Sequence, residues 1–526
     1  MICSGSPSVV VVGLDAAEVS LVERYMAEGA MPTLASLAPR GFMCRLSSVA
    51  DAFAGAVWPS FLYGVHPGKH GYCGGYPVKT GTLDVGPTVE IENPYRPFYA
   101  EMQEEPPRVV VLDVPKSYPD RKARGACLVA WGAHAARSTA ASHPPEILAE
   151  VMREIGPYPL PLLTQEDDVH ELSYYLDLLR RLLDGVEARR RLNRYFLRRD
   201  PSDLFITVFS ETHVVGHRFW HFMDESHPWH DENAPGKLKT AIRGVYAAVD
   251  GAIGDLVERI DPHATLLLVS GHGVKANYNA RELLPRFLER FCGVEGRLSE
   301  RPAFGRLAAG GALALRSLVP PALRARIKRH APWSVRQRVR SHYLKAIWGW
   351  DRWPAMRAFC TPTEDNGYIR VNLKGREPNG LVEPGAEYEA LLSELTAELL
   401  SLTDIESGRP VIASALRPQQ KYSGPAAPRM PDLIVHWAPG TPIRGLRSAR
   451  FGDVVAPPRL HHRSGDHQPH GFLVAAGPTV SRGAGPKDAH ILDLAPTILS
   501  LLDRPIPSHL DRKILPEIAP EHRGTC

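Results

Sequence analysis

Short apolar runs that end in glycine or a polar residue recur along the whole chain, and they constrain its fold more than any other feature. They are "SVVVVGLD" from Ser8, "RVVVLDVP" from Arg108, "DLFITVFSET" from Asp203, "ATLLLVSGHG" from Ala264 and "GFLVAAGP" from Gly471. Runs of this length and β-branched content are typical of strands buried on both faces. Stretches with helical spacing separate several of them. The alternation predicts an α/β fold with a mostly parallel central sheet covered by helices on both faces.

The size and charge of the chain limit the classes of protein to which it can belong. It has 526 residues, 44% of them hydrophobic and 23% charged, and can therefore bury a large core. The formal net charge of +4 is small for this length and indicates no nucleic-acid partner. No window approaches the roughly 20 apolar residues of a membrane helix, and the first residues lack the basic start of a signal peptide. The seven cysteines are scattered without a CxxC pair. We expect a reduced, cytoplasmic protein.

Two regions break the alternation and predict extra helical segments. Residues 144–199 end in "LLRRLLDGVEARRRLNRYFLRR", and residues 281–360 are strongly basic. We therefore expect a first core part (1–280) with a helical insert at about 144–199, a basic helical cap insertion (281–360) and a second core part (361–526). The basic cap has two interpretations: a solvated helical insert, or a surface for peripheral membrane contact or for an acidic substrate.

Polar residues follow several of the predicted strands. Asp15 ends the first run, His213 and His217 follow the run from Asp203, and His272 follows the run from Ala264. His467 lies in "HHRSGDHQPHG", just before the last run. In such sheets, binding and catalytic residues lie at the carboxyl ends of the strands. We therefore predict that these five side chains converge.

The histidine spacing suggests a metal site. His213 and His217 are spaced i, i+4, so both rings can face one point from a single helical turn, as zinc binding requires. The same spacing is also common among surface and capping histidines. His272 lies between two glycines in "SGHGV". For His272 and for His467 two interpretations stay open, a loop residue without a function or a metal ligand.

The ordered motifs point to a family. The sequence resembles the alkaline phosphatase superfamily, in its type I phosphodiesterase/nucleotide pyrophosphatase branch, over nearly the whole chain. The resemblance rests on "VVGLDAAE", "WPSFLYGVHPGKHG", "VVVLDVPKSYP", "LFITVFSETHVVGHRFWHF", "LLLVSGHGV", "NGYIRVNLKGREPNGLVEPGAEYEALL", "PDLIVHW", "DHQPHGFLVAAGP" and "ILDLAPTILSLL". It implies an alkaline-phosphatase-like sandwich, hydrolysis of nucleotide-like or phosphorylated small molecules, and two divalent metals, usually zinc, that activate a Thr or Ser nucleophile.

Four residues match the family's metal ligands by this resemblance: Asp15, His217, His272 and His467. Three other positions depart from the pattern. Ala54 stands where the nucleophile should be, His213 replaces an aspartate, and Gly271 replaces the aspartate that precedes His272. A methyl group cannot attack phosphorus or bridge two ions, so the covalent step of the family is lost.

The substitutions affect the two metal positions differently. His213, His217 and His467 give one position a full ligand set, because an Asp-to-His change exchanges an oxygen ligand for a nitrogen ligand. Three histidines with an open fourth position lower the pKa of zinc-bound water to about 7. We therefore expect one zinc ion and direct attack of its water on a phosphoester-like or other ester.

The second metal position keeps only Asp15 and His272. It forms a weak site if Asp51, Asp466 or the substrate completes the ligands; otherwise Asp15 and His272 act as a general base and acid. The rival interpretation of the whole pattern is a catalytically inactive pseudoenzyme that serves as a binding or scaffold protein. The ligand-preserving change at His213 favours catalysis.

The substrate contacts are predicted less directly. By the resemblance, Trp58, Lys69 and Asn366 line the cleft, although core packing is an alternative for Trp58. His221 continues the stripe of His213 but lies eight residues away, about 12 Å along a helix. We therefore assign His221 to substrate contact or to a buried polar role.

Overall fold

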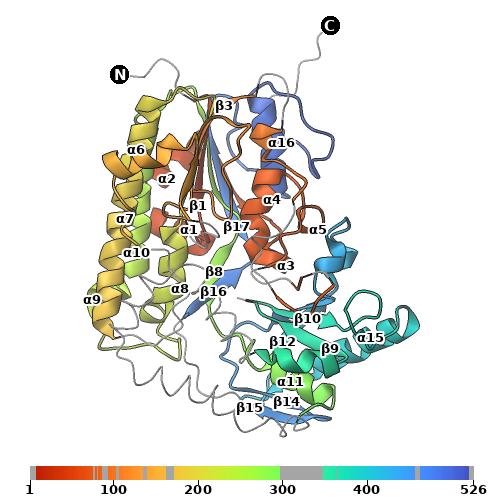
Figure 1. Cartoon of the computed structure of the whole chain (residues 1–526). Helices are drawn as coiled ribbons and strands as arrows, with labels where there is room; N and C mark the ends of the chain where they lie inside the picture. Colours follow the sequence, from red (N-terminus) through yellow and green to blue (C-terminus); the bar gives the residue numbers. More distant parts are fainter. Residues whose placement is uncertain are drawn as a thin grey trace.

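An eight-stranded sheet forms the centre of the molecule (Figure 1). The computed structural model describes residues 7–74, 78–79, 81–85, 93–101, 106–133, 139–160, 171–295, 348–363, 365–455 and 463–519. The strand order is β2 (Gly41–Leu46), β17 (Gly471–Ala476), β7 (Thr265–Ser270), β1 (Val9–Leu14), β6 (Leu204–Phe209), β3 (Arg108–Leu112), β4 (Arg124–Val129) and β5 (Ala141–His143).

The five central strands, from β7 to β4, pair in parallel. The antiparallel pairings lie toward the two edges, where β17 joins β7 to β2 and β5 joins β4. All five apolar runs form strands of this sheet. The structure therefore confirms the prediction of a mostly parallel sheet.

Helices cover both faces of the sheet, as predicted (Figure 1). One face carries α1 (Val19–Ala27), α2 (Pro32–Leu37), α6 (Glu146–Glu154), α7 (Leu172–Arg199), α8 (Glu211–Met223) and α10 (Ala241–Val257). The opposite face carries α3 (Ala50–Phe53), α4 (Val57–Tyr63) and α16 (Leu494–Leu501). Alternate residues of β1 serve the two cores, since Val10 and Val12 pack on the first face and Val9 and Val11 on the second. Burial on both faces explains why the strands are continuously apolar.

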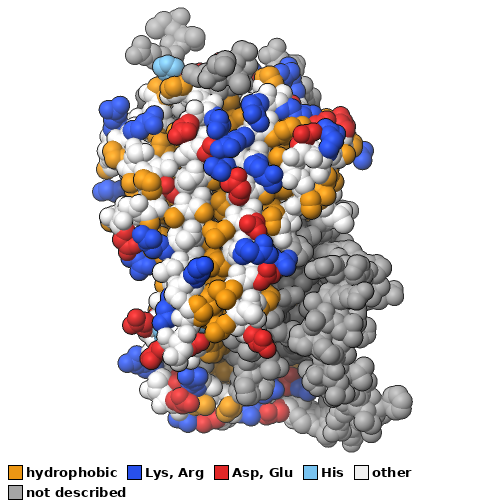
Figure 2. Space-filling model, turned by 90° about the vertical axis from the view of Figure 1, so that its left-hand side faces the viewer, with side chains coloured by type: hydrophobic (Ala, Val, Ile, Leu, Met, Phe, Trp, Pro, Cys, Tyr) orange, Lys and Arg blue, Asp and Glu red, His pale blue; other side chains and the backbone are white. Residues whose placement is uncertain are grey.

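The segment expected as a helical insert contributes to the first of these layers. Its long helix α7 packs along α10 and contacts α8. Figure 2 shows this side of the molecule, where charged side chains surround a band of apolar ones. Arginines of α7 form ion pairs within the protein, such as Arg180 with Asp177 at 2.8 Å and Arg199 with Glu150 at 2.8 Å.

A smaller unit lies beside the main sheet and has a core of its own (Figure 1). Its four-stranded antiparallel sheet has the order β12 (Ile412–Leu416), β13 (Leu433–Trp437), β10 (Gly367–Val371) and β9 (Ala358–Thr361). A second sheet comprises β11 (Thr403–Asp404), β14 (Gly445–Ser448) and β15 (Gly452–Val455). The helices α11 (Leu284–Phe291) and α15 (Ala386–Ser401) pack in the same core.

The expected domain boundaries stay predictions. Within the basic cap predicted at 281–360, residues 296–347 lie outside the described part of the chain, and with them most of the basic segment proposed for membrane contact. Among the helices that the structure describes, none combines the length and the apolar character needed to cross a membrane.

Candidate metal centre

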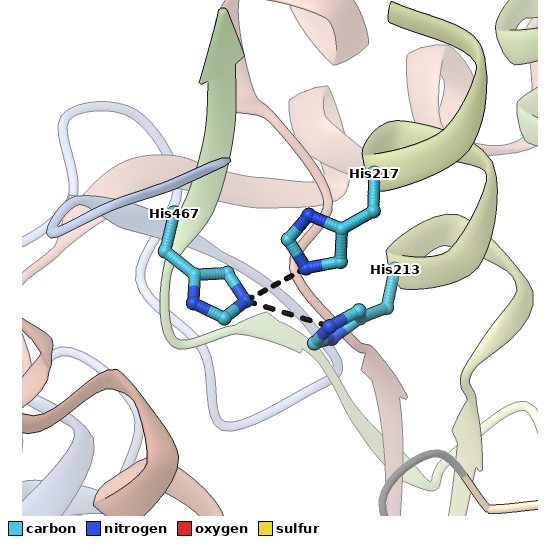
Figure 3. Close-up of side chains that lie close together, drawn as sticks. All are labelled: His213, His217 and His467. Atoms are coloured by element: carbon cyan, nitrogen blue, oxygen red, sulfur yellow. Dashed lines mark hydrogen bonds between the residues drawn. The ribbon is translucent and has the colours of Figure 1, made fainter. Parts of the chain in front are cut away.

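Three histidine side chains from two distant segments converge at the carboxyl end of the parallel strands (Figure 3). His213 and His217 lie on α8, which follows β6, and His467 lies on β16 (Gly465–Gln468). The Nε2 atom of His467 is 3.1 Å from Nε2 of His217 and 3.4 Å from Nε2 of His213. The i, i+4 spacing places both α8 rings on one side of the helix, as predicted from the sequence.

The hydrogen bonds of His217 leave one nitrogen for a ligand. Its Nδ1 donates to the carbonyl oxygen of Gly465 at 2.7 Å, so Nε2 carries the lone pair that faces the cluster. A side chain at Gly465 would not permit this approach, because a Cβ there would lie 2.2 Å from the carbonyl oxygen of Gly216 on α8. Burial lowers the pKa of His217 well below its ordinary value, and the charge of Arg463 lowers it further. The ring is therefore neutral, as a metal ligand must be.

The spacing of the three nitrogens fits zinc. Ligand nitrogens at about 2.0–2.1 Å from a tetrahedral zinc ion lie about 3.3–3.4 Å from one another. The two Nε2 separations at His467 agree with this value to within a few tenths of an ångström. Imidazole lone pairs that face each other at this distance repel unless a proton or a cation lies between them. His213, His217 and His467 therefore suit one metal ion.

The carboxylate of Asp15 orients His213. Its Oδ2 lies 3.0 Å from Nδ1 of His213, and its Oδ1 accepts a hydrogen bond from the indole of Trp58 at 2.8 Å. With Nδ1 of His213 donating to Asp15, its Nε2 faces the cluster as an acceptor. The contact from Trp58 gives this predicted cleft residue a place beside the centre, on the far side of Asp15.

His272 reaches the same cluster from the loop between β7 and β8 (Gly273–Ala276). Its side chain is buried, and its ring centre is 4.7 Å from that of His467. Neither ring nitrogen has a hydrogen-bond partner among the described residues. Burial lowers the pKa of His272 to about 4, so the ring is neutral at pH 7. Ligand atoms of Asp15, His213 and His272 lie within 4.8 Å of one another, as a second group that could hold a metal.

The side chain of Val57 occupies part of the space that an aspartate at position 271 would need. A Cβ at Gly271 would lie 2.3 Å from Cγ1 of Val57, so an aspartate there would collide with α4. Ala54 is buried, and beside it the ammonium of Lys116 donates to the carbonyl oxygen of Gly55 at 2.7 Å. The position predicted for the nucleophile thus carries a buried methyl group beside a lysine that is engaged by the backbone.

The neighbouring Ser60 is not arranged as a nucleophile either. Ser60 on α4 is fully buried, with its hydroxyl 2.9 Å from Nε2 of His70. His70 accepts a hydrogen bond from the backbone N–H of Tyr72 at Nδ1, 3.0 Å away. Its Nε2 therefore carries the proton and donates to Ser60, so His70 cannot act as the base for this hydroxyl.

A pocket of about 550 Å³ opens beside the histidine cluster. His467 and Asp466 line it from β16, Asp365 and Asn366 from the turn before β10, and Trp437 from the end of β13. The pocket thus lies between the main sheet and the smaller unit. Of the residues predicted for substrate contact, Asn366 lies at this pocket.

The structure places two other predicted contact residues elsewhere. Lys69 pairs with Asp511 and donates to the carbonyl oxygen of His509 at 3.0 Å. His221 is buried on α8, where its Nδ1 lies 2.8 Å from the hydroxyl of Ser464. Neither side chain lines the pocket beside His467.

Two acidic residues near the cluster carry contacts that the sequence did not reveal. Asp365 lies with Oδ2 3.6 Å from Nδ1 of His467. Asp466 accepts from the amide of Asn279 at 2.5 Å and pairs with Arg463 at 3.3 Å, and burial raises its pKa. Asp365 lies in the turn between the antiparallel strands β9 and β10, so the rule for the carboxyl ends of parallel strands does not find it. The turn-forming "EDNG" before β10 was the available signal.

Comparisons with known proteins agree with this architecture. Residues 9–469 match the family model described as type I phosphodiesterase/nucleotide pyrophosphatase. Among solved structures, phosphonoacetate hydrolase from Sinorhizobium meliloti is similar in its complexes with phosphonoformate (13% identity) and with phosphonoacetate (14% identity). Each match has a TM-score of 0.50 and covers 94% of this chain and 96% of the other.

A third similar structure is human ectonucleotide pyrophosphatase/phosphodiesterase 5, with 9% identity, a TM-score of 0.46 and coverage of 95% of this chain and 96% of that one. No curated protein matches the chain. At these identities the likeness to solved structures concerns the fold alone.

Proposed function

The chain belongs to the type I phosphodiesterase/nucleotide pyrophosphatase family, a family of hydrolases, and from this premise we propose that it cleaves a phosphoester-like bond with one zinc ion held by His213, His217 and His467. One observation carries the proposal: three Nε2 atoms converge while Nδ1 of His213 and His217 is engaged by Asp15 and Gly465. Zinc bound there would supply Lewis acidity toward water and toward the ester. The substrate is a small molecule that enters through the neighbouring pocket.

Water is the attacking group in this proposal, because Ala54 offers no hydroxyl. A single displacement by water inverts the configuration at phosphorus, whereas two displacements through a covalent enzyme retain it. His272 is the side chain best placed to assist, since its neutral ring lies beside the cluster with both nitrogens unpartnered among the described residues. It would either hold the attacking water by a hydrogen bond or add a further nitrogen ligand.

We propose a single ion instead of the family's usual pair. Both carboxylate oxygens of Asp15 have hydrogen-bonding neighbours, Trp58 and His213, and the aspartate that would share its metal is Gly271. Val57 packs within 2.3 Å of where a Cβ of residue 271 would lie. Asp15 then serves as a positioning residue for His213, and His272 is the ligand that remains for the second position.

The test is the metal content of zinc-loaded protein after gel filtration. The wild type should hold one zinc ion per chain, and His217→Ala should lose it. His263→Ala is the matched control, because His263 is an exposed histidine in the turn before β7. Two ions in the wild type would show that the second site survives, and equal zinc in wild type and His217→Ala would overturn the assignment of the ligands.

Hydrolysis is tested on the same samples with p-nitrophenyl phosphodiesters. Turnover should depend on His217, and a chiral phosphorothioate diester should be cleaved with inversion. Retention would require a covalent intermediate and would contradict attack by water. A wild-type protein that binds zinc but cleaves no ester would instead be the binding or scaffold protein of the rival hypothesis.

A further inference from the structure

The strands β8 and β16 form a two-stranded antiparallel ribbon that presents two of the histidines at the metal centre (Figure 1). His467 lies on β16, and His272 comes directly before the first residue of β8. This β8–β16 ribbon is separate from the other sheets that the structure describes. Because two paired strands are only marginally stable by themselves, contacts at the ends of the ribbon have to fix where the two rings lie.

One end of the β8–β16 ribbon is attached to α8. The backbone N–H of Ser464 donates to the carbonyl oxygen of His217 at 2.9 Å, and Nδ1 of His217 donates to the carbonyl oxygen of Gly465 at 2.7 Å. These contacts fix the start of β16. His467 lies nearer to the other end of the strand, so a second attachment is needed there to fix its ring.

A buried carboxylate holds this second end. Glu18, in the connection between β1 and α1, accepts a hydrogen bond at Oε2 from the side-chain amide of Gln468, the last residue of β16. Gly273 is the partner of Gln468 across the ribbon, and a Cβ there would lie 2.2 Å from the same Oε2. Any side chain at Gly273 would therefore push the carboxylate away from Gln468. Glu18 thus contacts both strands of the β8–β16 ribbon at one residue pair.

Glu18 is itself firmly held. Its Oε1 accepts hydrogen bonds from the backbone N–H of Ser20 at 3.1 Å and from the hydroxyl of Ser20 at 2.7 Å. Its own backbone N–H donates to the hydroxyl of Tyr246 on α10 at 2.9 Å. Both carboxylate oxygens and the backbone are therefore engaged, so the side chain is a fixed support for the ribbon.

Strand geometry relates this support to the metal centre. Successive side chains of a strand point to opposite faces. With Gln468 turned to Glu18, the ring of the neighbouring His467 is turned to the histidines of α8. A displacement of Gln468 would therefore move His467 relative to the other rings.

The segment that leads to His272 contacts the same β1–α1 connection. The hydroxyl of Ser270, the last residue of β7, lies 3.1 Å from the carbonyl oxygen of Ala17 and 2.8 Å from that of His272. Both histidines of the ribbon are thus tied to residues 17 and 18.

We infer that Glu18 is a positioning residue for the metal centre, which fixes the end of the β8–β16 ribbon from which His467 and His272 reach the other ligands. The inference rests on the proposed function only for the metal that these rings would serve. It gives a role to a buried acidic residue that contacts neither the metal ligands' rings nor the neighbouring pocket.

The simpler role for Glu18 is to cap α1, since it is the N-cap residue of that helix and accepts from the N–H of Ser20. The two roles use different oxygens, Oε1 for the cap and Oε2 for Gln468. Glu18→Asp separates them. Aspartate keeps the charge and is a favourable N-cap residue, but it is one methylene shorter and does not reach Gln468.

Hydrogen exchange of the metal-free protein measures the attachment of the ribbon. In Glu18→Asp, the backbone amides of β8 and β16 should exchange about tenfold faster than in the wild type, because a contact that opposes local opening is lost. Glu171→Asp is the matched control, the same change at the exposed N-cap residue of α7, and it should leave exchange in the ribbon unchanged. Wild-type exchange of the ribbon in Glu18→Asp would overturn the inference.

Zinc affinity, measured by competition with a chromogenic chelator, tests the link to the metal centre. Glu18→Asp and Gln468→Met should each lower the affinity about tenfold, and the double variant should be no weaker than either, because both changes remove one and the same contact. Gln420→Met, a change at an exposed glutamine, should have no effect. Losses that add in the double variant, or unchanged affinity in both single variants, would contradict the inference.

Gln468→Met supplies both measurements if Glu18→Asp does not fold. A wild-type protein that binds no zinc would overturn the proposed function, whereas hydrogen exchange of the metal-free protein decides separately whether Glu18 holds the ribbon.

Discussion

We propose for Asp15 a role other than the metal ligation that its sequence position suggests. A residue at the end of the first strand of such a sheet is expected to bind metal directly, yet its carboxylate lies between Trp58 and His213. In this proposal the imidazole of His213 reaches the cluster with Nε2 and presents Nδ1 to Asp15. A carboxylate in this position fixes the tautomer of a metal-binding histidine.

Asp15→Asn should therefore weaken zinc binding without abolishing it. The amide is a poorer acceptor for Nδ1–H of His213, and the loss of such a partner lowers metal affinity by about 10- to 100-fold. Competition with a chromogenic chelator measures the zinc affinity. Complete loss of zinc would make Asp15 a direct ligand, and an unchanged affinity would place it outside the centre.

Gly271→Asp tests whether the second metal position can be restored. The new side chain would meet Val57 at 2.3 Å, so we expect a loss of about 1–3 kcal/mol in the free energy of unfolding from overpacking. Val57→Ala in the same chain should recover part of that loss by making room. Urea unfolding and zinc stoichiometry measure the two effects. Wild-type stability together with two zinc ions in Gly271→Asp alone would show that the space is available.

At the scale of elements, α8 is decisive because it carries two of the three proposed ligands, His213 and His217. Its first residue, Glu211, is fixed by a buried ion cluster in which Nη1 of Arg189 on α7 lies 3.1 Å from Asp113 and Nε lies 3.3 Å from Glu211. The hydroxyl of Tyr158 donates to Glu211 at 2.6 Å. Arg189 is fully buried; burial by itself lowers its pKa, but the carboxylates of Glu211 and Asp113 together outweigh this and raise it, so the guanidinium stays charged. The cluster thus joins α7 to the end of β3 and to the start of α8.

Arg189→Met should lower the free energy of unfolding by about 3–5 kcal/mol, because it leaves two buried carboxyl groups without their cation. Arg198→Met on the same helix is the matched control, since Arg198 is exposed and its loss should change stability by less than about 0.5 kcal/mol. Urea unfolding of the metal-free proteins measures both values. Similar stability of the two variants would mean that the cluster contributes little to the position of α8.

The stability of the whole molecule depends on pH through its buried histidines. Burial lowers the pKa of His70 to about 3 and the pKa values of His272 and His490 to about 4. In the unfolded chain these rings bind protons near pH 6.5, whereas in the folded protein they stay neutral. The unfolded state therefore gains protons as the pH falls from about 6.5 toward 4, and the free energy of unfolding decreases over that range.

His70→Gln should reduce this pH dependence. Between pH 7 and pH 5, protonation of His70 in the unfolded chain alone costs the folded state about 2 kcal/mol, at about 1.4 kcal/mol per pH unit below 6.5. The variant loses its contact with Ser60 and should be less stable at pH 7, but its decline toward pH 5 should be smaller by that amount. Urea unfolding of the metal-free protein at the two pH values measures the decline. The same decline in His70→Gln as in the exposed control His263→Gln would contradict the assignment.

Short-range patterns in the sequence were sufficient to predict the α/β architecture. The five apolar runs form strands, and the i, i+4 pair His213 and His217 lies on a helix directly after one of them. Both features were predictable because burial on both faces of a sheet and helical periodicity each produce a pattern among neighbouring residues. The convergence of His467 with that pair also followed, since the carboxyl ends of parallel strands meet at one edge. The family was recognised from the same ordered motifs and is confirmed by the match over residues 9–469.

Only the tertiary structure decided how the centre is completed. That Val57 fills the space next to Gly271, that Asp15 turns to His213, and that Asp365 reaches His467 from the smaller unit all depend on contacts between segments far apart in the chain. Such contacts are set by the packing of whole layers to high density, which leaves no pattern in any single window of sequence. The sequence by itself thus determined the sheet, the family and the three converging histidines, while packing decided which groups surround them.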